Sequence, residues 1–198
     1  MISFFVLLIT LLVAALPVIE LKGAIPLGLG LAAHYSLDIN PWVYFVFAFI
    51  GSCLPAPFII AYLRPVLAFL GKTKLFKGLS DWVNKRISKK ASELNQKADK
   101  KADDYVQNLE DNNDIQKKSE AKKRRLDWLK YTALFLFVAI PLPLTGIWTG
   151  SGIASFMGLK VKAALPIVVL GNLVAGLIVM ALSLAGFQIA GISLINFG

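Results

Sequence analysis

The sequence predicts an all-α integral membrane protein, an inverted repeat of two re-entrant helical hairpins and two spanning helices, with one charged helical-hairpin insertion. The chain has 198 residues, and 57% of them are hydrophobic, which is too apolar for an ordinary soluble domain. Its charges gather between Lys72 and Lys130, which hold 17 basic and 10 acidic residues. Residues 39–63, 131–159 and 163–198 carry no formal charge, and each stretch exceeds the roughly 20 residues that cross a bilayer.

The first membrane repeat, residues 1–71, opens with two apolar runs that are too short to span. As a helix, residues 2–16 would reach about 22 Å, short of a hydrocarbon core of roughly 30 Å. A Pro/Gly-rich break from Pro17 to Pro26 follows, and the next run, 27–35, is shorter still. We therefore predict a re-entrant hairpin over 2–35 and then a spanning helix over 41–63, which Pro55 and Pro57 kink or break.

Residues 72–130 change to the pattern of amphipathic helices, with apolar residues at a spacing of three to four. Asp111-Asn-Asn-Asp114 reads as a turn, and a second helix over 115–130 would run on toward the membrane. A helical hairpin is our interpretation, and a disordered charged loop is the alternative, because isolated helices of this kind are marginal. The excess of lysine and arginine predicts a cytoplasmic insertion under the positive-inside rule, and it does not indicate a nucleic-acid partner.

The second membrane repeat, residues 131–198, follows the plan of the first. We predict a re-entrant hairpin over 131–159 and a spanning helix over 163–185. The breaks ALPVIELKGAIPLGLG (15–30) and AIPLPLTGIWTGSG (139–152) each place a glycine five or six residues after a proline. Such matched breaks in two membrane halves favour an internal repeat, and chance likeness of two Gly-rich apolar segments is the alternative.

Charge fixes the expected orientation. Arg64, Lys160, Lys162 and the insertion should be cytoplasmic, whereas the connection 34–40, which has no lysine or arginine, should lie outside. The two hairpins then enter from opposite faces, and the halves are inverted. Gly186 and Gly191 leave open whether 183–198 forms a separate segment.

Glu20 is the first candidate functional residue. A carboxylate at membrane depth is costly unless it is paired, protonated or faces water, so it is a functional candidate by default. Burial favours its protonated form and Lys22 favours its charged form, which suits a group that binds and releases protons or cations. A structural ion pair with Lys22, or a hairpin tip that reaches water, is the alternative.

The two breaks supply the rest of the expected site. Helix ends inside a membrane expose unpaired amides and carbonyls, and glycines let backbone approach a ligand closely, which predicts a polar cavity near the midplane. Ser52 and Asn172 stand at matching repeat positions, next to Gly51 and Gly171. Tight helix packing is the alternative role for these small residues. The expected substrate- or ion-binding residues are Glu20, Lys22, Gly23, Pro26, Thr145, Gly146, Trp148, Thr149, Ser151 and Asn172.

The sequence does not favour an enzyme. Thr149-Gly-Ser-Gly152 superficially resembles the G-x-S-G of membrane serine proteases, but position 149 is a threonine. The single histidine, His34, is assigned to the opposite face, so Ser151 has no evident base. The single cysteine, Cys53, excludes an intramolecular disulfide and a cysteine-based metal site, and we expect no cofactor.

With those residues in view, the chain resembles the putative small multidrug export protein family of bacteria and archaea. The resemblance rests on PVIELKGAIPLG (17–28) and PLPLTGIWTGSG (141–152). It covers both membrane halves and not the insertion. It implies a membrane protein that exports small molecules.

That family looks like a remote relative of the DedA/VTT membrane proteins, which have paired re-entrant hairpins and include lipid-phosphate translocases. Glu20, Pro26 and Gly28 are similar to the first hairpin of that superfamily. The second hairpin departs from it, because this chain has Pro141, Pro143 and Thr145 where DedA proteins have basic residues.

We therefore expect a small inverted-repeat transporter in the cell membrane of a prokaryote, with Glu20 facing the coupling ion or the substrate. Ion-coupled export or flipping of a small or amphiphilic substrate is the leading hypothesis. One alternative is a lipid- or polyprenyl-phosphate translocase, with Lys22 meeting the phosphate. Another is a non-transporting scaffold whose basic hairpin binds a partner or anionic lipids. The expected partners are the bilayer, an unidentified substrate and, since each half has few helices, further copies of the chain.

Overall fold

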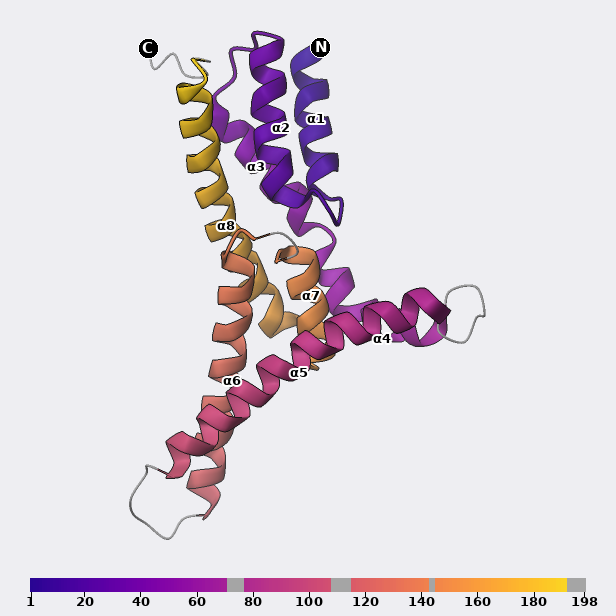
Figure 1. Ribbon diagram of the computed structural model, residues 1–198, viewed down its shortest axis with the longest axis vertical. Helices are drawn as coiled ribbons and strands as arrows, with labels where there is room; N and C mark the ends of the chain where they lie inside the picture. Colours follow the sequence, from indigo (N-terminus) through magenta and orange to yellow (C-terminus); the bar gives the residue numbers. More distant parts are fainter. Residues whose placement is uncertain (71–76, 108–114, 143–144, 192–198) are drawn as a thin grey trace.

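A computed structural model describes residues 1–70, 77–107, 115–142 and 145–191, and the regular elements in these ranges are all helices. In chain order they are α1 (Ile2–Ala14), α2 (Glu20–His34), α3 (Pro41–Cys53), α4 (Ala56–Leu70), α5 (Lys77–Gln107), α6 (Ile115–Ala139), α7 (Ile147–Phe156) and α8 (Val161–Ile189). They form an elongated molecule of two stacked helical bundles, and α5 lies across the lower one (Figure 1).

The upper bundle contains α1, α2, α3 and the C-terminal half of α8 (Figure 1). α1 and α2 form a helical hairpin whose turn points toward the middle of the molecule (Figure 1). α3 packs tightly on α1, because a Cβ at Gly51 would run into the carbonyl oxygen of Leu11. The core of this bundle includes Leu21, Ile25, Tyr44 and Met180.

The lower bundle contains α4, α6, α7 and the N-terminal half of α8 (Figure 1). α6 and α7 form a second hairpin, and its tip points toward the tip of the first (Figure 1). α8 packs on α6 as α3 packs on α1: a Cβ at Gly171 would lie 2.9 Å from Cβ of Val138 and 3.0 Å from the carbonyl oxygen of Phe135. The core of this bundle includes Leu134, Ile147, Ile153 and Val168.

Two apolar segments in the described part of the chain are long enough to cross a bilayer. They are Pro41–Leu67, with 27 residues, and Val161–Ile189, with 29. The first is interrupted where Pro55 predicts a kink, since α3 ends at Cys53 and α4 begins at Ala56. The second, α8, is longer than the expected 163–185 and continues through Gly186. The last seven residues of the C-terminal stretch whose status was open, 192–198, lie outside the described residues.

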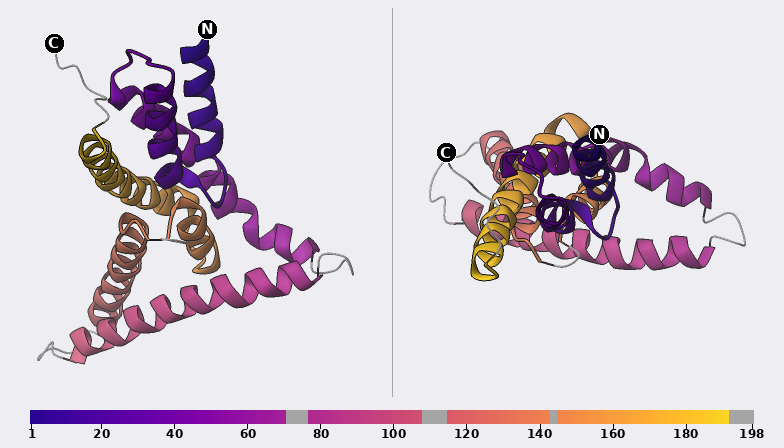
Figure 2. Two further views of the ribbon diagram at one scale, coloured as in Figure 1. Left: turned by 45° about the horizontal axis from the view of Figure 1, so that its top comes forward. Right: turned by 90° about the horizontal axis from the view of Figure 1, so that it is seen from above.

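The insertion is helical in its described parts, as predicted, and it packs against the lower bundle. α5 is one helix of 31 residues that runs from beside the end of α4 to beside the start of α6 (Figure 2). Its apolar side includes Ala91, which belongs to the core of the lower bundle, and Ile87, whose Cδ1 lies 3.1 Å from where Gly152 would carry a Cβ. α6 continues without a break from the insertion into the second hairpin. The expected turn at residues 111–114 lies outside the described residues.

Both Pro/Gly-rich breaks are shorter than we expected, which corrects two predictions. α2 begins at Glu20, so Gly23 and Pro26 are helical, and α7 begins at Ile147, so residues 150–152 are helical as well. Pro26 costs its helix only the hydrogen bond to the carbonyl of Lys22. Gly150 serves packing instead of a turn, because a Cβ there would collide with the side chain of Val138 on α6.

The second arms of the two hairpins end in the same motif. Ser36, with φ 50°, follows α2, and Gly158, with φ 71°, follows α7, both in the left-handed region. In each case an N–H one residue further on donates back to a carbonyl near the helix end: Leu37 to Ala32 at 2.9 Å and Leu159 to Ala154 at 3.0 Å. This is the Schellman arrangement.

Candidate functional site

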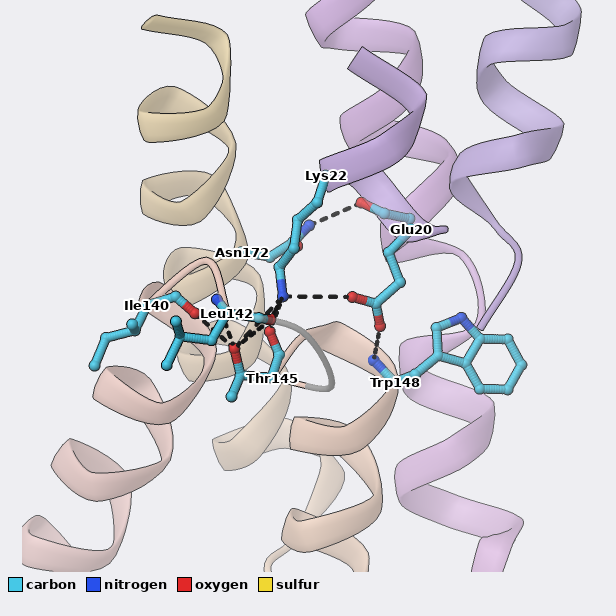
Figure 3. A network of polar contacts seen from close by, with 8 residues as sticks. Glu20, Lys22, Ile140, Leu142, Thr145, Trp148 and Asn172 are labelled. Carbon is cyan, nitrogen blue, oxygen red and sulfur yellow. Dashed lines mark hydrogen bonds and ion pairs between the residues drawn. The ribbon is translucent and has the colours of Figure 1, made fainter. Parts of the chain in front are cut away.

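The tips of the two hairpins meet in the middle of the molecule and are joined by hydrogen bonds (Figure 3). The ammonium group of Lys22 donates to the carbonyl of Leu142 at 2.7 Å and also to the carbonyl of Thr145. In the other direction, the backbone N–H of Trp148 donates to Oε1 of Glu20 at 3.2 Å, and the indole N–H of Trp148 donates to the carbonyl of Ala15 at 3.2 Å. The two tips are therefore interlocked by both side-chain and backbone groups.

Glu20 caps the N-terminus of α7 from the opposite hairpin. The N-cap residue of α7 is Gly146, which has no side chain to accept a hydrogen bond from the free amides of the first turn. The Glu20 carboxylate supplies that acceptor, and its negative charge suits the positive end of the helix dipole. Gly146 is required for this approach, because a Cβ at that position would overlap the carboxylate.

Lys22 binds the carbonyl groups of the connection between α6 and α7. Carbonyls outside a helix have no helical partner and need other donors. Lys22 donates to two of them, while the hydroxyl of Thr145 donates to a third, that of Ile140, at 2.7 Å. Lys22 and Glu20 also form an ion pair of 3.9 Å with each other. Glu20 thus meets the positive end of a helix, and Lys22 meets the carbonyls of the connection that leads to it.

The backbone of Glu20 is in an unusual conformation. Its φ is 51°, in the left-handed region that non-glycine residues rarely adopt. Such a conformation costs about 1–2 kcal/mol for a residue with a side chain. The carboxylate that it directs to α7 is buried, with the residue 6% exposed. Strained residues of this kind cluster at functional sites, where surrounding contacts hold them in place.

A cavity of about 370 Å³ lies beside the interlocked tips. The first hairpin contributes residues 17–20, Lys22 and Gly23, and the second contributes Pro141, Leu142 and Thr149. The volume is within the range of small-molecule sites, and the lining combines apolar walls with one carboxylate and one ammonium group. The arrangement can hold a small molecule against a charged pair that also joins two helical hairpins.

The structure brings seven of the ten expected site residues to the tips and leaves three elsewhere. The seven are Glu20, Lys22, Gly23, Thr145, Gly146, Trp148 and Thr149. Pro26 lies further along α2, inside the helix. Ser151 is fully buried in α7, and its hydroxyl has no hydrogen-bond partner among the described residues. Asn172 on α8 donates to the hydroxyl of Ser52 at 2.8 Å, instead of to the charged pair.

Sequence reasoning missed the backbone acceptors of this site. The carbonyls of Ala15, Leu142 and Thr145 bind Trp148 and Lys22, yet they belong to residues of any type. The available signal was general: a helix that ends inside a membrane leaves carbonyls that need donors. Which donor serves which carbonyl depends on how two segments more than a hundred residues apart meet.

Comparison with known proteins gives one match. A family model described as "Putative small multi-drug export protein" matches residues 20–178, a stretch that includes Glu20, Lys22 and the whole second tip. No curated protein and no solved structure matches the chain. The remote link to the DedA/VTT proteins stays a prediction. The match covers far more than half of the chain, which therefore belongs to the small multidrug export protein family.

Proposed function

We propose that this protein is an ion-coupled transporter that moves a small or amphiphilic substrate through the cavity between the hairpin tips. The observation that carries the proposal is the double role of Glu20. It is a buried carboxylate beside a cavity, and it is also the cap of a helix in the other half of the chain. An event at Glu20 therefore acts directly on the contact between the two halves.

The charge of Glu20 stabilises the closed arrangement. A proton or a cation that binds the carboxylate competes with the amide of Trp148 and with the ammonium group of Lys22. Charge-assisted hydrogen bonds are about twice as strong as neutral ones, so neutralising the carboxylate weakens the link between the tips. Ion binding would then favour separation of the tips, and release of the ion would favour closure. This gives a physical basis for coupling between an ion and a substrate in the cavity.

Matched features of α1–α3 and α6–α8 support an inverted repeat of re-entrant hairpins. α2 and α7 end in the same motif, and Gly51 and Gly171 each let the helix that follows a hairpin pack on the first arm of that hairpin. The residues after these glycines, Ser52 and Asn172, bond to each other. α1 has 13 residues and would reach about 20 Å as a helix, too short to span. In this proposal the hairpins enter from opposite faces and the insertion is cytoplasmic.

The test is substrate flux into proteoliposomes, with one cationic and one anionic amphiphile, tetraphenylphosphonium and dodecyl phosphate, as probes and an imposed pH gradient. We expect Glu20→Gln to reduce gradient-driven flux by about tenfold or more, because glutamine cannot bind and release a proton. Asp38→Asn is the matched control, since it removes a carboxylate from the exposed α2–α3 connection, and it should transport normally.

Gradient-driven flux that survives Glu20→Gln at every pH would contradict the coupling role. Wild-type protein that moves neither probe would contradict the export function itself. Flux that survives only without a gradient would assign Glu20 to ion coupling and not to the substrate path.

A further inference from the structure

A second cavity, of about 510 Å³, lies between α5 and the second hairpin. Six of its lining residues lie on α5, and the others are Phe137, Thr145 and Thr149. We propose that it is a binding site for an anionic amphiphile, a molecule with one negatively charged head and an apolar chain. This inference rests on the proposed function and names the class of substrate that reaches the central site.

The charge of the lining favours an anion. Arg86, Lys89 and Lys90 line the cavity, against one carboxylate, that of Glu93. Glu93 lies 3.9 Å from Lys90 and neutralises it in part. Lys89 has no acidic partner within the described part of the chain, and the Arg86 guanidinium lies over the ring of Trp82, 5.4 Å from its centroid. Two cations thus remain for a bound head group.

The walls of the cavity favour an apolar chain. Trp82 and Ile87 of α5 face the cavity together with Phe137 of α6. Trp82 is 57% exposed, which is high for the largest apolar side chain. Cations held next to exposed aromatic and aliphatic surface match a ligand that carries both a charge and a chain, whereas an inorganic ion would use the cations alone.

The position of the cavity links it to the hairpin tips. Thr149 lines this cavity and also the cavity that contains Glu20 and Lys22. Thr145, on the same wall, accepts a hydrogen bond from Lys22 through its backbone carbonyl. Only Thr145 and Thr149, at the start of α7, therefore need to lie between a head group held by α5 and Lys22. The basic residues of α5 form an outer site for the ligand that the tips then receive.

The experiment measures binding of radiolabelled dodecyl phosphate to the full chain in phosphatidylcholine nanodiscs, after subtraction of uptake by empty nanodiscs. The test variant carries Arg86→Gln, Lys89→Gln and Lys90→Gln. The control carries Lys97→Gln, Lys100→Gln and Lys101→Gln, which removes the same charge from exposed positions of the same helix away from the cavity. We expect the dissociation constant to rise about tenfold or more in the test variant and less than about twofold in the control.

The single substitution Lys89→Gln covers the case in which the triple variant misfolds, because this side chain is exposed and its replacement should not disturb the fold. It should weaken binding severalfold. Nanodiscs that also contain phosphatidylglycerol separate the two sources of the ligand. If a membrane lipid is the occupant, phosphatidylglycerol blocks dodecyl phosphate; if a dissolved amphiphile is, binding persists, and both results support the site.

Equal weakening in the two triple variants, or none in either, would overturn the proposal, and so would competition by inorganic phosphate as strong as that by dodecyl phosphate. Binding is measured without flux, so failed transport with a selective loss in the test variant would reject the transport function and keep the site. Normal Glu20-dependent transport without selective binding would reject the site and keep the transport function.

Discussion

Glu20 and Lys22 stand two residues apart at the start of α2, and the spacing explains how one tip makes two different contacts with the other. Side chains two residues apart on a regular helix lie on different faces. Glu20 reaches the amide of Trp148, and Lys22 reaches the carbonyl of Leu142. The two charges still remain close enough for an ion pair of 3.9 Å, and Glu20 itself has a left-handed backbone.

Gly146→Ala tests whether this contact holds the tips together. The added methyl group would overlap the Glu20 carboxylate, and forcing an extra group into a packed site costs about 1–3 kcal/mol. We expect a lower thermal unfolding midpoint in detergent, and restoration of much of the loss when Glu20→Ala is added to Gly146→Ala.

Gly186→Ala is the control for that variant. Nothing lies within 4 Å of the Cβ that it would add, and alanine favours a helix over glycine by about 1 kcal/mol. Its midpoint should stay the same or rise. Equal stability of the two alanine variants would mean that the tips are apart in the detergent-solubilised protein.

The charged residues of the site could be predicted because charged residues are rare in this part of the sequence. A carboxylate and an ammonium group between apolar runs are conspicuous, and both lie at the tip. Ser151 lies in the core instead of at the tip, and a sequence does not distinguish these two positions for a small hydroxyl inside a helix.

At the scale of elements, the order and type of the helices followed from apolar periodicity and from proline positions, while the lengths of the breaks did not. A proline or glycine indicates a break in a helix only when it has no other role, such as close helix packing. Gly150 and Gly171 are explained by the close approach of α7 and α8 to α6, which a sequence alone does not display. The same ambiguity made the start of α7 look irregular.

The bond between Ser52 and Asn172 is a polar link between α3 and α8 that a double-mutant cycle can measure, and Asn172 also donates to Sγ of Cys53 at 3.8 Å. Buried interhelical hydrogen bonds in membrane proteins are worth about 0.6 kcal/mol on average, with a maximum near 1.7. A double-mutant cycle of Ser52→Ala and Asn172→Ala, measured by unfolding in mixed micelles, should give a coupling energy in this range.

Ser183 on the same helix supplies the comparison cycle. It lies three turns beyond Asn172 along α8, and residues without shared partners show additive effects within about 0.5 kcal/mol. Ser183→Ala with Asn172→Ala should therefore show no coupling. A Ser52 cycle that is just as additive would remove the hydrogen bond as a link between the two spanning segments.

At the scale of the whole molecule, the connection between α2 and α3 and the basic helix α5 lie at opposite ends (Figure 1). The positive-inside rule then predicts that residues 35–40 are outside and α5 is in the cytoplasm. Entry of the two hairpins from opposite faces stays a prediction, which rests on matched breaks and charge. The contact of α5 with α7 was not predictable, because an amphipathic stripe shows that a helix needs a partner surface without saying which one.

Cysteine labelling of intact cells checks this orientation. In a Cys53→Ala background, Ser36→Cys should react with a membrane-impermeant maleimide from outside, whereas Lys97→Cys should react only after permeabilisation. Both native side chains are exposed, so access through the membrane is the variable that differs. The opposite pattern would reverse the topology.

Because α6 is continuous, a movement of the charged insertion is transmitted to the tip of the second hairpin. This helix has 25 residues, about 37 Å of stiff rod, with one end in the insertion and the other at the tip that Lys22 holds. A tilt of about 10° at one end displaces the other by about 6 Å. Under the proposed function, a protein that binds the far end of α6 would therefore change how often the tips separate.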